Sequence, residues 1–244
     1  MQEHKYSVVM SKIINRLRYH SRQFWQSIEL TTGFAVKKVK RANIRKRFNE
    51  GRLWYQEQFF EFNISPDDKV LDIGSGPFPF KYATVLCEKY MDDTTHRRGK
   101  IVTAGLPLYT ADICERLPFE DKEFDFVYCA HVLEHVDDPF KACKEIMRVG
   151  KRGFIETPNF MKDALFCQAE GMSHRWHTIA QKNTLFFFEY SKRQAEGVRS
   201  TAWKDEIWSD YHHPLQDVFL NNQDLFNTMF YWEDSFEIVV IEQN

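Results

Sequence analysis

The chain has 244 residues, of which 43% are hydrophobic and 28% charged, a composition that favours one globular α/β domain with additions over a disordered chain. No apolar run approaches the roughly 18 residues of a membrane span, no signal peptide is evident, and the five cysteines form no Cys-x-x-Cys pair. We therefore expect a cytoplasmic protein without a disulfide framework or a cysteine zinc site.

The first 52 residues are strongly basic, with 13 Lys and Arg against three acids, whereas the remainder carries 20 bases and 32 acids. Ile13, Leu17 and Trp25 stand among these bases at a spacing compatible with an amphipathic helix. We predict a basic helical arm over residues 1–62 and a second domain over residues 63–244. The arm could dock on the acidic domain of its own chain or of a second copy in a homo-oligomer, lie on an anionic membrane surface, or bind a nucleic acid.

Residues 70–76 read Val-Leu-Asp-Ile-Gly-Ser-Gly, a short apolar strand that runs into a glycine turn. Pro77 and Pro79 follow where a dinucleotide-binding fold would need a third glycine, so the turn shows no cradle for a diphosphate. Asp72 stands where a carboxylate could contact a ligand held at this turn. The alternative for Asp72 is that it only orders the loop through backbone hydrogen bonds.

Strands and helices are predicted to alternate along the rest of the chain. We expect helices over 81–90 and from Asp138-Pro139 to Met147, strands over 100–104, 124–129 and 153–157, a hairpin over 174–190 and a last strand over 236–241. This alternation predicts a mostly parallel sheet whose ligands gather at the carboxyl ends of the strands. Gly74, Asp112, Ala130 and Thr157 fall there.

The glycine loop is the first of several motifs that stand in a characteristic order. The others are Leu117-Pro118-Phe119 behind an acidic residue, Val132-Leu133-Glu134-His135-Val136, and Arg148-Val149-Gly150 before a strand. Over residues 64–160 the chain resembles class I S-adenosylmethionine-dependent methyltransferases of type 11. The resemblance implies a Rossmann-like α/β fold with helices on both faces of the sheet, and S-adenosyl-L-methionine as cofactor. We place a substrate-side insertion at residues 160–235.

The resemblance also implies a cofactor site. Asp72, Gly74, Ser75 and Gly76 would hold the amino acid end of the cofactor, Asp112 and Ile113 its adenine, and Ala130 would lie beside them. Most family members carry an acid at the end of the second strand for the ribose hydroxyls. None of Glu88, Asp92 and Asp93 stands clearly at a strand end, so this contact is unassigned.

Histidines supply the catalytic candidates. The pattern from His131 to His135 is His-x-x-Glu-His, the inverted zinc peptidase motif, but it directly follows a methyltransferase-like strand, so we expect no metal site and rank zinc hydrolysis low. His131 is predicted near a helix N-terminus, which would keep its ring neutral and able to accept a proton. His135 ranks second, with helix packing as its alternative. The C-terminal region supplies further candidates, which are His174, His177, His212 and His213.

The predicted function is methyl transfer, favoured on an oxygen atom of a small molecule, a sugar, or a lipid-linked or other anionic acceptor. Most of the acceleration would come from aligning acceptor, methyl group and sulfur, with a base as a secondary aid. The alternative from another class is a non-catalytic module that keeps the fold and holds a membrane or nucleic acid through the arm. The unassigned ribose carboxylate is the feature that favours this alternative.

Overall fold

The computed structural model describes residues 53, 55–92, 100–166, 174–192, 194, 218 and 222–243. The chain divides into two compact units, Met1–Glu61 and Phe62–Asn244. In the first unit, Leu53, Tyr55 and Gln56 are helical, and the rings of Tyr55 and Phe59 lie 5.1 Å apart. Residues 1–52 of the predicted arm over residues 1–62, which hold its basic part, lie outside the described residues.

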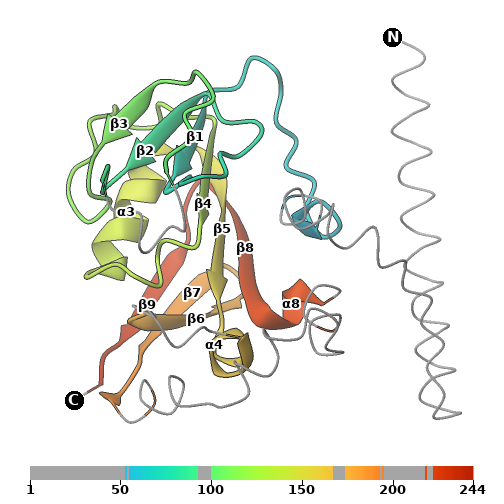
Figure 1. Cartoon of the computed structure of the whole chain (residues 1–244), viewed down its shortest axis with the longest axis vertical. Helices are drawn as coiled ribbons and strands as arrows, with labels where there is room; N and C mark the ends of the chain where they lie inside the picture. Colours follow the sequence, from blue (N-terminus) through green and yellow to red (C-terminus); the bar gives the residue numbers. More distant parts are fainter. Residues whose placement is uncertain are drawn as a thin grey trace, which may run out of the picture. The chain divides into compact units, whose positions relative to one another are not determined.

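The second unit contains a large and a small β-sheet (Figure 1). The large sheet has the strand order β3-β2-β1-β4-β5-β8, and its strands are β1 (Val70–Ile73), β2 (Val85–Glu88), β3 (Leu108–Thr110), β4 (Phe126–Ala130), β5 (Arg152–Pro158) and β8 (Asn227–Glu233). Strands β1 to β5 are parallel, and β8 pairs antiparallel with β5. The order reverses between β1 and β4, which defines a doubly wound, Rossmann-like sheet and confirms the predicted fold class.

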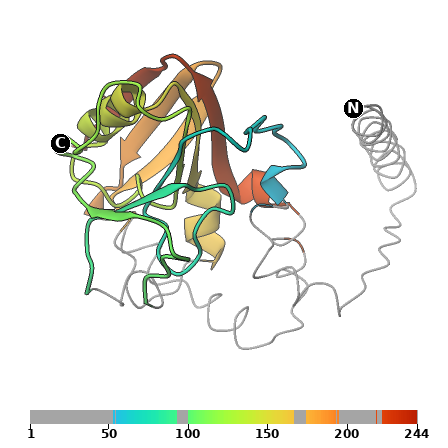
Figure 2. The ribbon, with the colours of Figure 1, turned by 90° about the horizontal axis from the view of Figure 1, so that it is seen from above.

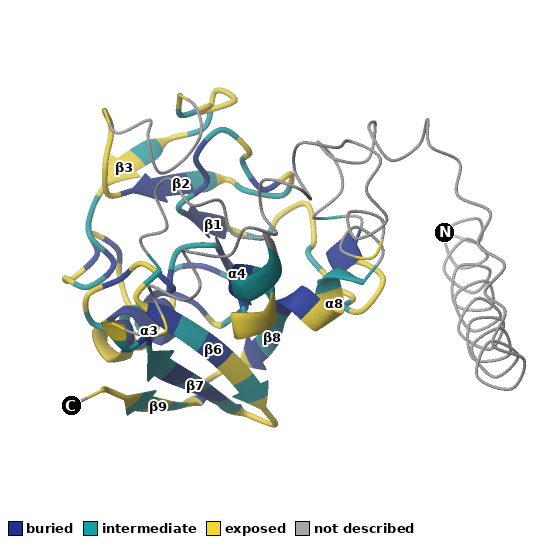
Figure 3. Cartoon of the chain, turned by 60° about the horizontal axis from the view of Figure 1, so that its bottom comes forward, coloured by how far each residue is buried: buried dark blue, intermediate teal, exposed yellow. Residues whose placement is uncertain are grey.

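The small sheet has the order β6-β7-β9 and consists of β6 (Trp176–Gln181), β7 (Thr184–Glu189) and β9 (Glu237–Ile241). β6 and β7 form the predicted antiparallel hairpin, and β9 is the predicted last strand. Buried and more exposed residues alternate along β6 and β7 (Figure 3). The buried side chains, among them Trp176 and Phe187, join one core with side chains of the large sheet.

Three helices lie in the described connections of the second unit. They are α3 (Pro139–Val149), α4 (Phe160–Phe166) and α8 (Gln223–Phe226). α3 joins β4 to β5, and its buried face, with Ala142, Cys143 and Ile146, belongs to the core. It can be followed in yellow-green in the view from above (Figure 2). Residues 74–84 and 111–125, which join β1 to β2 and β3 to β4, contain no helix.

Two predicted elements are wrong. The helix expected over 81–90 is replaced by β2, because the apolar run Val85-Leu86-Cys87 pairs with β1 on one side and β3 on the other. The strand expected over 100–104 does not form, and the chain becomes a strand only at Leu108. A short apolar run does not distinguish a helix from a buried strand, and here the neighbouring strands decide.

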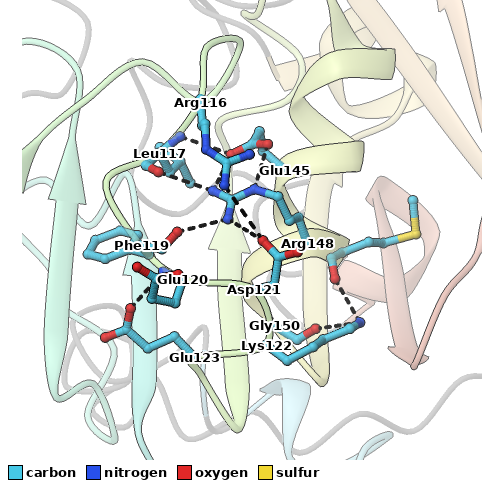
Figure 4. A network of polar contacts seen from close by, with 11 residues as sticks. Arg116, Leu117, Phe119, Glu120, Asp121, Lys122, Glu123, Glu145, Arg148 and Gly150 are labelled. Carbon is cyan, nitrogen blue, oxygen red and sulfur yellow. Dashed lines mark hydrogen bonds and ion pairs between the residues drawn. The ribbon is translucent and has the colours of Figure 1, made fainter.

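An arginine holds the helix-free connection between β3 and β4 in place (Figure 4). Arg148, near the end of α3, donates to the carbonyl oxygens of Leu117 and Phe119 at 3.1 and 2.8 Å. It also pairs with both carboxylate oxygens of Glu145 at 2.9 and 2.8 Å. Glu145 in turn accepts a hydrogen bond from the Leu117 amide at 2.9 Å. Side chains of α3 thus order the chain that leads from Asp112 to β4.

Candidate functional site

The glycine loop after β1 has the backbone that its sequence predicts. Gly74 and Gly76 have φ values of 72° and 54°, in the left-handed region that favours glycine. A Cβ atom at Gly74 would lie 2.2 Å from Cγ2 of Val132. Gly74 is therefore required both by its backbone angle and by its contact with the segment that follows β4.

Glu88 is the last residue of β2, and its carboxylate turns to the glycine loop. Its Oε1 accepts hydrogen bonds from the Gly76 amide at 2.5 Å and from the Ser75 hydroxyl at 3.2 Å. In the sequence Glu88 falls within the predicted helix over 81–90, so its place at a strand end could not be assigned. Glu88 follows Gly76 by only 12 residues, because no helix intervenes between β1 and β2.

Asp72 lies within β1 and is buried. Its Oδ2 accepts a hydrogen bond from the Phe80 amide at 2.7 Å. The side chain thus orders the far end of the glycine loop, which is the alternative that the sequence left open. The same carboxylate stands at the carboxyl edge of the sheet beside Gly74, so ordering the loop and facing a ligand are compatible.

Asp112 and Ile113 follow the end of β3. Asp112 Oδ1 accepts from the Cys114 amide at 2.9 Å, and Oδ2 pairs with Lys89 Nζ at 2.7 Å. Partial burial opposes ionisation of Asp112, but the hydrogen bonds from Lys89 and Cys114 outweigh it and lower the pKa of this carboxyl. Ile113 is buried. Acids therefore stand near the carboxyl ends of β1, β2 and β3, and two of them, Asp72 and Glu88, accept hydrogen bonds from amides of the glycine loop.

His131 follows Ala130, the buried last residue of β4, and has a positive φ of 59°. Its amide donates to the carbonyl oxygen of Glu156 at 2.8 Å. In the ring, Nε2 lies 3.0 Å from Glu156 Oε1, and Nδ1 lies 3.4 Å from Glu134 Oε1. Glu156, a buried acid within β5, was missed by the sequence analysis; its only signal was a charge in the apolar run from Gly153 to Thr157.

The predicted helix N-terminus at His131 is wrong. Residues 131–138 form turns and bends, and α3 begins only at Pro139, where Asp138 caps it by accepting from the Lys141 amide at 3.0 Å. A helix dipole therefore does not act on His131. The helix that the inverted zinc peptidase motif requires is also absent from residues 131–138, so His131 and His135 are not one helical turn apart.

A second group of histidines surrounds Glu134. The rings of His135 and His174 meet edge to face at 4.7 Å, and His135 Nε2 lies 3.8 Å from Glu134 Oε1. Burial opposes ionisation of Glu134, but the nearby imidazoles of His131, His135 and His174 outweigh it and lower its pKa to about 2. The structure thus brings three of the predicted histidines around one carboxylate.

The remaining histidines do not join this group in the described residues. His177 lies on β6 and stacks on Phe188 with ring centroids 5.1 Å apart. Burial lowers the pKa of His177. His212 and His213 lie outside the described residues. No helix in the described part of the chain is both long enough and apolar enough to span a membrane.

The strand order defines the class of this fold, and one segment of the chain matches a known protein family. Residues 80–155 match the sequence model of a family described as a methyltransferase domain. This segment runs from β2 into β5 and includes Glu88, Asp112 and His131, whereas the glycine loop precedes it. The predicted resemblance to S-adenosylmethionine-dependent methyltransferases is therefore confirmed over residues 80–155.

Individual proteins match parts of the chain. An uncharacterized protein of Methanocaldococcus jannaschii, MJ1123, is 33% identical over 116 residues, which are 44% of this chain and 52% of that protein, so the chain spans about half of this curated relative. A SAM-dependent methyltransferase from Archaeoglobus fulgidus is 22% identical, with a TM-score of 0.36, over 46% of this chain and 53% of the other. A possible histamine N-methyltransferase from Thermotoga maritima is 21% identical, with a TM-score of 0.33, over 47% of this chain and 59% of the other.

Proposed function

We propose that this protein transfers a methyl group from S-adenosylmethionine to an oxygen atom of a small-molecule, sugar or lipid-linked acceptor. The observation that carries the proposal is the row of acids near the carboxyl ends of β1, β2 and β3, two of which bond to the glycine loop. Such a row suits a donor with an ammonium group, a sulfonium and two ribose hydroxyls and no phosphate. The match of residues 80–155 to a methyltransferase domain supports the same donor.

The position of each acid suits it to bind a different part of the donor. Asp72 and the amides of residues 74–76 would hold the amino acid end, and Asp112 with the buried Ile113 would line the adenine. Glu88 would accept hydrogen bonds from the ribose hydroxyls, as the acid at the end of the second strand. The bonds from the Gly76 amide and the Ser75 hydroxyl both go to Oε1 of Glu88 and fix this carboxylate at the strand end.

His131 is the proposed base. Donation from Nε2 to Glu156 would leave the lone pair on Nδ1 and would stabilise the ring once it is protonated. Nδ1 lies 3.4 Å from the Glu134 carboxylate, an ion-pair distance longer than a well-formed hydrogen bond. Because an ionised carboxylate cannot donate to Nδ1, an acceptor hydroxyl can replace this contact and pass its proton to Nδ1. S-adenosylmethionine, when bound, supplies the electrophilic methyl group.

Glu88 bears on the non-catalytic alternative. That alternative was favoured because no carboxylate could be assigned to the ribose hydroxyls. Glu88, at the end of the second strand, is now a candidate for this contact. The basic arm, on which the membrane and nucleic acid interpretations depend, lies outside the described residues. Its role stays a prediction.

Two variants with different expected effects test the proposal. Glu88→Gln should weaken binding of S-adenosylmethionine by about tenfold to a hundredfold, because a charged acceptor of the ribose hydroxyls is lost. Isothermal titration calorimetry measures this effect, with exposed Glu242→Gln as the matched control. His131→Ala should lower turnover by about a hundredfold at unchanged donor affinity, since it removes the base. Turnover is followed as release of S-adenosylhomocysteine with a panel of hydroxylated acceptors.

The outcomes separate the parts of the proposal. A wild-type protein that binds no S-adenosylmethionine would contradict the function as a whole. Equal affinity in Glu88→Gln and wild type would remove Glu88 from the donor site. An unchanged rate in His131→Ala would remove the base.

A further inference from the structure

Glu134, His135 and His174 form a compact group of potential metal ligands. One ligand atom from each residue lies within 4.8 Å of the other two. Glu134 and His135 belong to the turn after β4, and His174 stands two residues before β6. The group therefore combines two residues of the motif from His131 to His135 with a histidine about 40 residues further along the chain.

The Glu134 carboxylate is the unusual member of this group. Its side chain is 1% exposed, and among the described residues neither of its oxygens has a hydrogen-bond partner. The nearest cationic or imidazole nitrogens are His131 Nδ1 at 3.4 Å and His135 Nε2 at 3.8 Å. A buried carboxylate without hydrogen bonds is costly unless another positive partner completes its surroundings.

His174 has the supporting contacts of a metal ligand. Its Nδ1 lies 2.9 Å from Asp163 Oδ1, and the second oxygen of this buried carboxylate accepts from the Tyr190 hydroxyl at 2.8 Å. The carboxylate favours the tautomer with hydrogen on Nδ1, which leaves the lone pair on Nε2. A histidine that binds a metal through one nitrogen commonly donates from the other to a carboxylate in this way.

Backbone hydrogen bonds fix the two halves of the group to each other. The carbonyl oxygen of Glu134 accepts from the amides of Arg175 and Trp176 at 2.8 and 3.2 Å. The Trp176 indole nitrogen donates to the carbonyl oxygen of Val136 at 2.7 Å. The ligands are thus positioned by the fold itself, so little ordering would be needed on binding.

We propose that Glu134, His135 and His174 bind a divalent transition-metal ion, with Zn²⁺ as the reference ion. Two imidazoles and one carboxylate are a donor set that such ions prefer over Mg²⁺, and three protein ligands leave a coordination position open. Ligand bonds to Zn²⁺ are about 2.0–2.2 Å long. The three ligand atoms lie within 4.8 Å of one another, so the side chains would move slightly closer together when the ion binds.

This site differs from that of an inverted zinc peptidase, because His131 is turned to Glu156 and is replaced as a ligand by His174. The site adjoins His131, the proposed base. If the proposed function holds, the open position would take an oxygen of the acceptor and make its hydroxyl easier to deprotonate. Metal binding itself does not depend on that function.

Calorimetric titration of tag-free protein, freed of metal by EDTA dialysis, tests the proposal with Zn²⁺ and no methyl donor. We expect one equivalent to bind with a Kd below about 10 µM, as a preformed three-ligand site should. His135→Ala and Glu134→Gln should each weaken Zn²⁺ by at least a hundredfold. Asp163→Asn should weaken it by about tenfold to a hundredfold, through loss of the contact to His174. The matched control is His177→Ala, which should bind as wild type.

His135 is the decisive position, because its side chain is 35% exposed and its replacement should leave the fold intact. Saturating Zn²⁺ should raise the Tm of the wild type and of His177→Ala but not that of His135→Ala. Wild-type binding weaker than about 100 µM, equal affinity in His135→Ala and His177→Ala, or Mg²⁺ binding more tightly than Zn²⁺ would each overturn the proposal. Donor binding without metal binding would overturn this inference alone, whereas metal binding without donor binding would overturn only the proposed function.

Discussion

On the β1, β2 and β3 side of the large sheet, carboxylates accept hydrogen bonds from loop amides, whereas in the turn after β4 carbonyl oxygens accept hydrogen bonds from Arg175 and Trp176 at the start of β6. Asp72 accepts from Phe80, Glu88 from Gly76, and Asp112 from Cys114. By contrast, Glu134 is anchored through its carbonyl oxygen by Arg175 and Trp176. On the first side the acids that would face the ligand also build their own loops. On the second side the Glu134 carboxylate makes no hydrogen bond among the described residues.

Arg148→Ala should give the largest loss of stability, because the connection between β3 and β4 has no helix of its own. The variant removes bonds to two carbonyl oxygens and leaves Glu145 without its bidentate partner. We expect the free energy of unfolding to fall by about 3 kcal/mol. Urea denaturation measures the loss.

Arg116→Ala is the matched control, since both arginines contact Asp121. The Arg148 side chain is 14% exposed and that of Arg116 73%, with a 3.8 Å contact to Asp121. The control should change stability by less than about 0.5 kcal/mol. Similar losses in both variants would show that side chains do not hold this connection.

Gly74→Ala should have the next largest effect, because the new Cβ would meet Val132 and the positive φ would be strained. We expect a loss of about 2 kcal/mol in the free energy of unfolding. Val132→Ala in the same chain should recover part of this loss, since it removes the clashing methyl group. Strictly additive losses in the double variant would contradict the contact between the glycine loop and the turn after β4.

Asp125→Asn should have the smallest effect and should depend on pH. Lys151 Nζ at 2.6 Å and the Lys69 amide at 2.9 Å hold the pKa of Asp125 below its ordinary value. The unfolded chain therefore takes up this proton first as the pH falls. The stabilisation is present above about pH 4 and is lost as the pH falls through the pKa of the folded state.

At pH 7 the expected loss for Asp125→Asn is a few tenths of a kcal/mol, about the value of an exposed ion pair. Urea denaturation over a series of pH values should show the difference from wild type vanishing in acid. Exposed Asp67→Asn serves as the control. A difference that grows as the pH falls would have the wrong sign for this pair.

The sequence predicted the elements whose local signals agree with their tertiary surroundings. The strand β4, the helix after Asp138-Pro139, β5 and the hairpin of β6 and β7 all formed near their expected bounds. The expected helix over 81–90 failed because its apolar run found strand partners on both sides. That error also hid Glu88, whose position at a strand end becomes visible only once β2 is known.

The candidate site was predictable where its residues are neighbours in sequence. The glycine loop and the motif from His131 to His135 could be recognised directly. The contact of His131 with Glu156 and that of Glu134 with His174 could not, because each depends on pairing between distant segments. The turn at His131, with its positive φ, also has no local signal, since histidine does not favour that conformation as glycine does.

The short, helix-free path from β1 to β2 has a consequence for the order in which the molecule assembles. The bond between Gly76 and Glu88 closes a loop of 12 residues, whereas that between Trp176 and Val136 spans 40. Shorter loops lose less chain entropy on closing, and contacts of low sequence separation form sooner during folding. We therefore expect nascent chains to shape the glycine loop first and to gather the histidines around Glu134 late.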